Sequence, residues 1–166
     1  MKRVILGVDP GFVIAGYAII SIDQGKTELL ECGLLAMKTK DADSSTAQHR
    51  LHCCYNFFTE KITRYQVTEV ALETPFFGKN AQNFLKLGYV RGILLLLSAQ
   101  HNCHVREFAP RQVKMAITGF GGAEKDQVMR VIMRLFPRLP IQPRYDVTDA
   151  IAVALCCSWA TAEPVR

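Results

Sequence analysis

The chain lacks the marks of membrane, disulfide-rich and low-complexity proteins. No stretch of about 18 apolar residues occurs, so no segment is predicted to span a membrane. The 6 cysteines include two adjacent pairs and no Cys-x-x-Cys spacing, which argues against zinc and disulfide frameworks and favours a reducing cytoplasm. No linker, repeat or biased segment divides the sequence. We therefore expect a single domain over 1–166.

The positive charge of the chain is concentrated in its middle. The whole sequence has 20 Lys plus Arg and 15 Asp plus Glu. The segment 76–123 holds six basic residues and one acid, a net charge of +5 that equals that of the whole chain. A basic segment beside acidic islands favours an enzyme that binds a polyanion and a cation. A solvated basic face is the alternative.

Hydrophobic periodicity predicts an α/β fold with a mixed five-stranded sheet flanked by helices. The expected strands are 4–9, 16–22, 27–37, 67–73 and 104–108, the second and third forming a hairpin around 24–26. The expected helices are one from about residue 47 with Ser44 or Ser45 as its cap, one over 81–100, one over 110–116, one carrying Val128 to Phe136, and one over 146–159.

The predicted helix 81–100 is apolar nearly all round. It carries Phe84, Leu85, Leu87, Tyr89 and Val90 before the run Ile93–Leu97. Such a helix needs cover on both sides. The sheet covers one side, and the other is covered either by the same domain or by a second subunit, which Gly88 and Gly92 would allow to approach closely.

Four acids lie at the ends of regular elements. Asp9 and Glu73 end two apolar strands, while Asp146 and Asp149 open the last helix. If the first and fourth strands are neighbours, these carboxylates crowd together and require a cation. Oxygen ligands suit Mg²⁺ or Mn²⁺, and two such ions can hydrolyse a phosphodiester.

Two of these patterns have purely structural explanations. Asp9-Pro10-Gly11 is a good turn sequence. Asp146 and Asp149 resemble a capping box, in which Asp146 would be only the N-cap of the helix. Glu73 is harder to explain in this way, and the four acids together favour catalysis.

Four collinear blocks resemble the RuvC family, the bacterial Holliday junction resolvases. They are Ile5–Gly11 with Gly16-Tyr17, Glu73 with Phe76–Ala81, Leu85–Gly88 and Arg91-Gly92, Arg111–Lys114 with Gly119–Lys125 and Gln127-Val128, and Asp146–Ala154. The resemblance implies a ribonuclease-H-like fold and an Mg²⁺-dependent endodeoxyribonuclease with Mn²⁺ as a substitute and two ions per subunit. It further implies paired symmetric nicks in four-way DNA junctions during recombination and repair.

The resemblance also implies residue roles and partners. Asp9, Glu73, Asp146 and Asp149 would be the catalytic metal ligands, with Lys125 near the scissile phosphate. The expected DNA-binding residues are Phe76, Phe77, Lys79, Asn80, Lys86, Arg111, Lys114 and Lys125. The expected partners are a four-way junction, a second copy of the chain docked through the helix 81–100, and a branch-migration helicase.

Some residues depart from the family pattern, and other functions stay open. Phe12, Ala15, Ala18 and Thr74-Pro75 replace the residues usual at their positions, which affects the surroundings of the acids rather than the acids themselves. One alternative is a related nuclease of the same fold with another branched substrate. Another is a non-catalytic junction-binding protein. The actin-like kinases and ATPases share a similar opening strand but need two lobes, for which this chain is too short.

Overall fold

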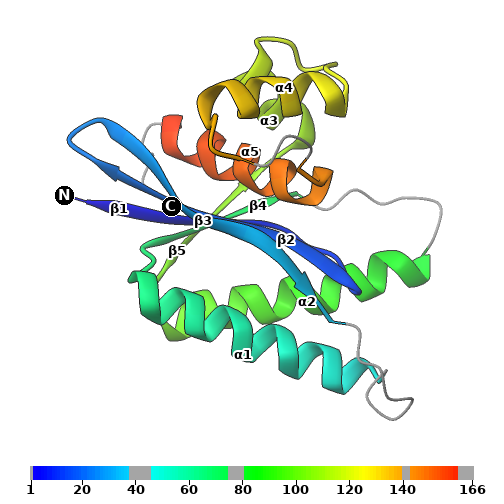
Figure 1. Ribbon diagram of the computed structural model, residues 1–166. Helices are drawn as coiled ribbons and strands as arrows, with labels where there is room; N and C mark the ends of the chain where they lie inside the picture. Colours follow the sequence, from blue (N-terminus) through cyan, green and yellow to red (C-terminus); the bar gives the residue numbers. More distant parts are fainter. Residues whose placement is uncertain (1, 38–45, 75–80, 140–142, 161–166) are drawn as a thin grey trace.

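The protein is built around one mixed five-stranded sheet (Figure 1). The computed structural model describes residues 2–37, 46–74, 81–139 and 143–160. The strand order is β3-β2-β1-β4-β5. Strand β2 pairs antiparallel with both β1 and β3, whereas β4 pairs parallel with both β1 and β5. The strands are β1 Arg3–Asp9, β2 Ile14–Asp23, β3 Lys26–Ala36, β4 Glu69–Glu73 and β5 His104–Phe108.

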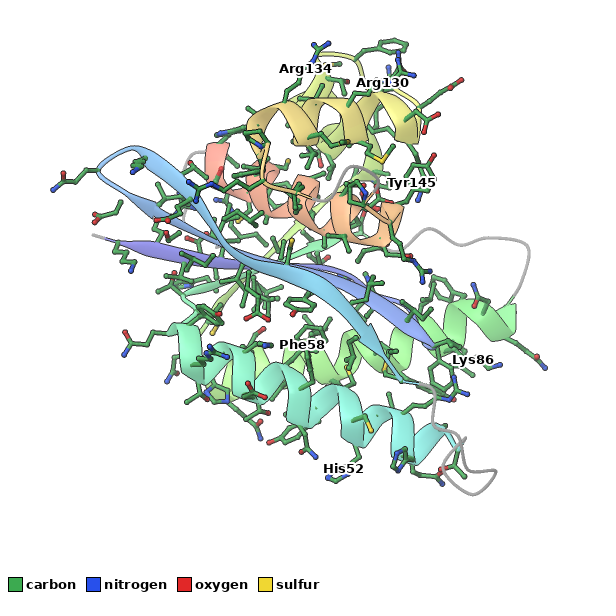
Figure 2. All side chains as sticks on the ribbon, viewed as in Figure 1. His52, Phe58, Lys86, Arg130, Arg134 and Tyr145 are labelled. Carbon is green, nitrogen blue, oxygen red and sulfur yellow. The ribbon has the colours of Figure 1, made fainter. Side chains whose placement is uncertain are left out.

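The helices form a layer on each face of this sheet (Figure 1). One face carries α1 Ala47–Tyr65 and α2 Ala81–Gln100, and the other carries α3 Pro110–Thr118, α4 Lys125–Leu135 and α5 Tyr145–Trp159. Successive side chains of β1 point to opposite faces of the sheet and so contribute to both cores. Ile5 packs beneath α5, while Leu6 and Val8 pack against α1 and α2. Figure 2 shows Phe58 of α1 in the second of these cores.

The hairpin between β2 and β3 turns through two residues with positive φ. Gln24 has φ 49° and Gly25 has φ 79°. Left-handed conformation at both central residues is the geometry of a type I′ turn, which matches the twist of paired strands. The hairpin predicted at this position is confirmed.

Helix α5 is buried along nearly its whole length between the sheet and the pair α3 and α4. Its C-terminal end is held by two arginines. Arg3 donates to the carbonyl oxygens of Cys157 and Ser158 while pairing with Glu69, and Arg106 donates to the carbonyl of Ala160 over 3.1 Å. Cations at helix carbonyls are favourable there. These contacts fix α5 along its axis.

Several predicted boundaries were wrong by a few residues. The N-cap of α1 is Thr46, whose hydroxyl accepts from the backbone N–H of His49, and not Ser44 or Ser45. Helix α3 continues past Ala116 to Thr118, because a left-handed Gly119 rather than the preceding apolar pattern ends it.

Helix α2 is not enclosed on both sides by the described part of the chain. Val90, Leu94 and Leu97 are buried, whereas Leu85, Tyr89, Leu95 and Leu96 are exposed. Burial against the described residues of the domain therefore does not explain its apolar character. Among the described helices, none has the length and apolarity needed to cross a bilayer.

Candidate active site

Asp9 and Glu73 end two neighbouring parallel strands. Val8 of β1 pairs with Leu72 of β4, and the next residue along each strand is one of these acids. Alternation along β4 puts Glu73 on the face covered by α5, because Ala71, two residues earlier, packs in that core. The first and fourth strands are therefore neighbours in the sheet, as the crowding of the carboxylates required.

Two glycines let the start of α5 lie directly on the sheet at this point. A Cβ on Gly16, the β2 residue paired with Asp9, would lie 1.9 Å from the carbonyl oxygen of Asp146. A Cβ on Gly7 would lie 2.3 Å from the carbonyl oxygen of Ala150. Only a residue without a side chain allows such an approach. The first turns of α5 are thereby brought to Asp9.

Asp146 is not the N-cap of α5. The helix begins at Tyr145 with Arg144 as its N-cap, and Asp146 lies in the first turn. Its Oδ2 is 3.2 Å from Nη2 of Arg144. The N-cap explanation of Asp146 is therefore wrong, because the helix starts one residue before the position that the sequence suggested.

A cavity of about 250 Å³ opens where these elements meet. Its charged lining residues are Asp9, Glu73, Lys114, Lys125 and Asp149, and its other lining residues are Pro110, Val113, Val128 and Ala152. Nζ of Lys125 lies 2.6 Å from Oδ2 of Asp149, so the lysine at the start of α4 reaches an acid on α5. Residues far apart in the sequence thus line one polar space.

The electrostatics of the cavity indicate an excess of negative charge. Burial, together with the charges of Asp149 and Glu73, raises the pKa of Asp9 to about 7, although Lys125 opposes this. Burial and the charge of Asp149 also raise the pKa of Glu73. Raised pKa values of neighbouring carboxylates are characteristic of functional sites and of sites that take a cation.

The donor chemistry fits a hard divalent cation. All four acids offer carboxylate oxygens, which Mg²⁺ and Mn²⁺ prefer. As they stand, no three His, Cys, Asp or Glu side chains among the described residues could hold a metal ion together. Asp149 is paired with Lys125 and Asp146 with Arg144. Metal binding would therefore require these two acids to exchange partners.

The predicted DNA-binding residues divide into three groups. Lys114 and Lys125 line the cavity. Arg111 is exposed on α3, and Lys86 of α2 lies with its Nζ 5.8 Å from the ring centre of Phe12. Figure 2 shows Lys86 on the face of the sheet opposite α5. The remaining four, Phe76, Phe77, Lys79 and Asn80, lie outside the described residues.

The structure adds residues that the sequence argument did not assign to the site. Arg91 donates a 2.9 Å hydrogen bond to the backbone carbonyl of Glu73 and pairs with Glu107. Its place in the second block of the family resemblance was a signal, but the sequence argument gave it no role in the site. Tyr145 donates a hydrogen bond to Asp126 at the start of α4, and no periodicity or motif pointed to that contact.

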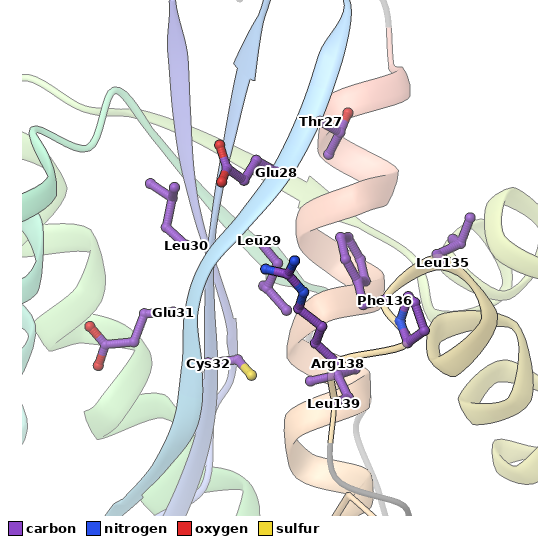
Figure 3. A pocket seen from close by; sticks show the side chains of 11 residues that line it. Thr27, Glu28, Leu29, Leu30, Glu31, Cys32, Leu135, Phe136, Arg138 and Leu139 are labelled. Atoms are coloured by element: carbon purple, nitrogen blue, oxygen red, sulfur yellow. The ribbon is translucent and has the colours of Figure 1, made fainter.

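A larger cavity of about 450 Å³ lies elsewhere, along the edge strand β3 (Figure 3). In Figure 3 its Glu31 lies on the side of β3 away from Phe136 and Arg138. The carboxylate of Glu31 accepts hydrogen bonds from the side chains of Tyr17, Lys61 and Tyr65. This acid is therefore engaged in the structure, and the smaller cavity is the better candidate for catalysis.

A family model described as Crossover junction endodeoxyribonuclease RuvC matches residues 5–157. The chain belongs to the RuvC family. RuvC of a Roseiflexus species is 41% identical over 156 residues, covering 93% of this chain and 90% of the relative. RuvC of Pelodictyon phaeoclathratiforme is 39% identical over 153 residues, covering 92% of this chain and 78% of the relative. The predicted family and enzyme class, an endodeoxyribonuclease, are confirmed.

Solved structures of RuvC have the same fold. RuvC of Thermus thermophilus in complex with Holliday junction substrate superimposes with a TM-score of 0.84 at 24% identity, covering 95% of this chain and 93% of that one. The yeast mitochondrial Holliday junction resolvase gives a TM-score of 0.64 at 12% identity, covering 92% and 77%. These likenesses confirm the predicted ribonuclease-H-like fold.

Proposed function

We propose that this RuvC family member resolves four-way DNA junctions by paired symmetric nicks in recombination and repair. One observation carries the proposal: acids from β1, β4 and α5 and lysines from α3 and α4 line a single cavity. Such a site can bind a phosphodiester next to cations and hydrolyse it. We also propose that residues 1–166 act as one domain in the cytoplasm, where the 6 free cysteines stay reduced.

The four acids Asp9, Glu73, Asp146 and Asp149 would hold two Mg²⁺ ions per subunit, with Mn²⁺ as a substitute. When bound, such ions activate a water and stabilise the leaving oxygen of the phosphodiester. The raised pKa of Asp9 supports this assignment, because a buried carboxylate among like charges is stabilised by a cation. To bind the metal, Asp146 would leave Arg144 and Asp149 would leave Lys125.

The basic and aromatic residues would hold the DNA. Lys125, with its side chain 60% exposed, would place its ammonium at the scissile phosphate and stabilise the charge that develops there. Lys114 would bind a neighbouring phosphate from the cavity wall, and Arg111 and Lys86 would contact phosphates farther out. Phe76 would stack on a base at the junction centre. The same segment would contribute Phe77, Lys79 and Asn80.

A second copy of the chain would cover the exposed apolar face of α2. Beyond the backbone of α2 itself, a Cβ on Gly88 or on Gly92 would meet no atom of the described residues within 4 Å, so another helix could approach closely there. Leu96, exposed to 49%, supports the same arrangement. A two-fold dimer suits the near two-fold symmetry of a four-way junction. A branch-migration helicase would be a further partner.

The proposal is tested by incubating the protein with a mobile four-way DNA junction in Mg²⁺, in Mn²⁺ and in EDTA. We expect paired symmetric nicks with either metal and none in EDTA. Asp9→Asn should bind the junction but not cut it, because the buried ligand oxygen is lost. The matched control is Asp23→Asn, the same change on the exposed β2–β3 hairpin, which should cut like the wild type.

Each failure points to a different alternative. Binding without cleavage in every metal would mean a non-catalytic junction-binding protein. Equal cleavage of forks or flaps would mean a related nuclease with another branched substrate. Hydrolysis of ATP without DNA cleavage would favour the actin-like superfamily.

A further inference from the structure

The N-terminal ends of α4 and α5 are joined by two reciprocal contacts. From α4, Lys125 donates to Asp149 of α5 over 2.6 Å. From α5, Tyr145 donates its phenolic hydrogen to Asp126 of α4. The two α4 residues are consecutive, and the two α5 residues are four apart, which places them on one helix face. Figure 2 shows Tyr145 at the start of α5. We call this set the helix clasp.

Lys125 has a second partner within the helix clasp. Its Nζ lies 5.8 Å from the ring centre of Tyr145, within the range of a cation–π interaction. The hydrogen bond to Asp126 holds that ring from the α4 side. Asp126 therefore fixes the ring of Tyr145, and that ring in turn contacts Lys125, the residue just before Asp126.

Asp149 and the ring of Tyr145 differ in whether they leave the charge and the hydrogen-bond donors of the Lys125 ammonium available to a substrate. Asp149 occupies a hydrogen-bond donor of the ammonium and neutralises its charge. An aromatic ring attracts the ammonium through its quadrupole, so it leaves the charge in place and donors available for a phosphate. A lysine held only by a ring can still serve an anionic substrate.

We propose that Tyr145 is a positioning residue that keeps Lys125 beside the scissile phosphate once Asp149 has turned to the cation. This inference rests on the proposed function, because it takes Asp149 as a metal ligand and Lys125 as a phosphate contact. If Asp149 bound a metal, the lysine would lose the carboxylate that now lies 2.6 Å from its Nζ. The ring of Tyr145 then limits the motion of a long and otherwise exposed side chain.

Single-turnover cleavage of a four-way junction at saturating protein and saturating Mg²⁺ measures this role. Tyr145→Leu removes the ring and should slow cleavage about 10-fold with unchanged junction affinity. Tyr145→Phe keeps the ring but frees it from Asp126, and we expect a loss of about 3-fold. Asp126→Ala should match Tyr145→Phe, and the two together should not add. Tyr55→Phe, which removes a phenolic hydrogen bond on α1, is the matched control.

A double-mutant cycle separates positioning from a general structural role. In a Lys125→Met background, Tyr145→Leu should have no further effect, because the residue it positions is already gone. Equal losses with and without Lys125 would overturn the inference, as would wild-type rates in Tyr145→Leu. Both outcomes leave the proposed function intact. A wild type that cuts no junction overturns both proposals, so the two failures are distinguishable.

Discussion

Gly16 and Asp146 are so close that no side chain fits between them: a Cβ on the glycine would lie 1.9 Å from the carbonyl oxygen of the aspartate. The obstacle is helix backbone, which cannot rotate away as a side chain can. The acids of α5 therefore reach those of the sheet only because β2 carries glycine at this position.

Gly16→Ala should accordingly displace the start of α5. We expect a loss of about 3 kcal/mol in the free energy of unfolding, measured in urea, and at least about tenfold slower cleavage. Gly33→Ala on β3 is the comparison, because its Cβ would meet the Tyr17 ring at 3.2 Å, where a small shift relieves the contact. Equal effects of the two substitutions would contradict the importance of the α5 approach.

Because the carboxyl of Asp9 is half-buried among like charges, we expect the stability of the protein to depend on pH in EDTA. Its pKa in the folded protein is about 7, above the ordinary value of 3.8 for an aspartate, so folding favours the protonated form. That contribution is present below about pH 4 and is lost as the pH rises toward 7. Asp9→Asn removes the ionisable group and should exceed the wild type in stability by roughly 2–4 kcal/mol at pH 8, but not at pH 4.

Urea denaturation at both pH values measures this difference. Asp23→Asn, the same change at an exposed position, should follow the wild type throughout. A constant difference between Asp9→Asn and the wild type across the pH range would show that burial and like charges do not act on Asp9.

Divalent cations should reverse the same instability. At pH 8, Mg²⁺ at about 100 times its dissociation constant should stabilise the wild type by about 2.7 kcal/mol, because it binds only the folded chain. Asp9→Asn should gain much less, and EDTA should abolish the gain. Thermal unfolding with increasing Mg²⁺ measures the effect, and equal gains in both proteins would argue against Asp9 as a ligand.

Arg91 should matter for cleavage although it lies outside the cavity lining. Its side chain, 13% exposed, donates to the carbonyl of Glu73 and pairs with Glu107, so it holds the end of β4. Arg91→Ala should slow cleavage about tenfold, and Arg91→Lys should restore part of the rate. Arg64→Ala, at the end of α1, is the control. Wild-type rates in Arg91→Ala would show that β4 holds Glu73 without help.

The exposed face of α2 should control the oligomeric state. Leu96→Glu places a charge on that face and should convert a dimer to monomers in sedimentation, with loss of paired nicks. Leu135→Glu is a matched control, because Leu135 is 48% exposed and Leu96 is 49% exposed, but Leu135 lies on α4. A wild type that sediments as a monomer would refute the proposed interface.

The sequence predicted the parts of the site that depend on local pattern. Strands that end in acids, and the final helix with its two acids, follow from periodicity. The first residue of α5 did not, because Arg144 and Tyr145 carry no start signal and the N-cap Arg144 makes no side-chain capping hydrogen bond. The contact of Lys125 with Asp149 joins two helices through tertiary packing alone, so no spacing rule could reveal it.

The proposed DNA-binding residues follow less clearly from the sequence than the acids do. A lysine is common on any surface, and only its place in the fold separates Lys114 in the cavity wall from Lys86 on the opposite face of the sheet. The roles of Phe76 and its neighbours stay predictions, since they lie outside the described residues.

The position of α5 at the end of the fold has a consequence for the timing of activity. The ribosome completes β1 and β4 long before it reaches Asp146, so two of the four acids, Asp146 and Asp149, are missing until then. Contacts between such distant parts of a chain form late in folding. If all four acids are needed for cleavage, as proposed, the growing polypeptide cannot nick DNA, and nuclease activity begins only after α5 has been synthesised.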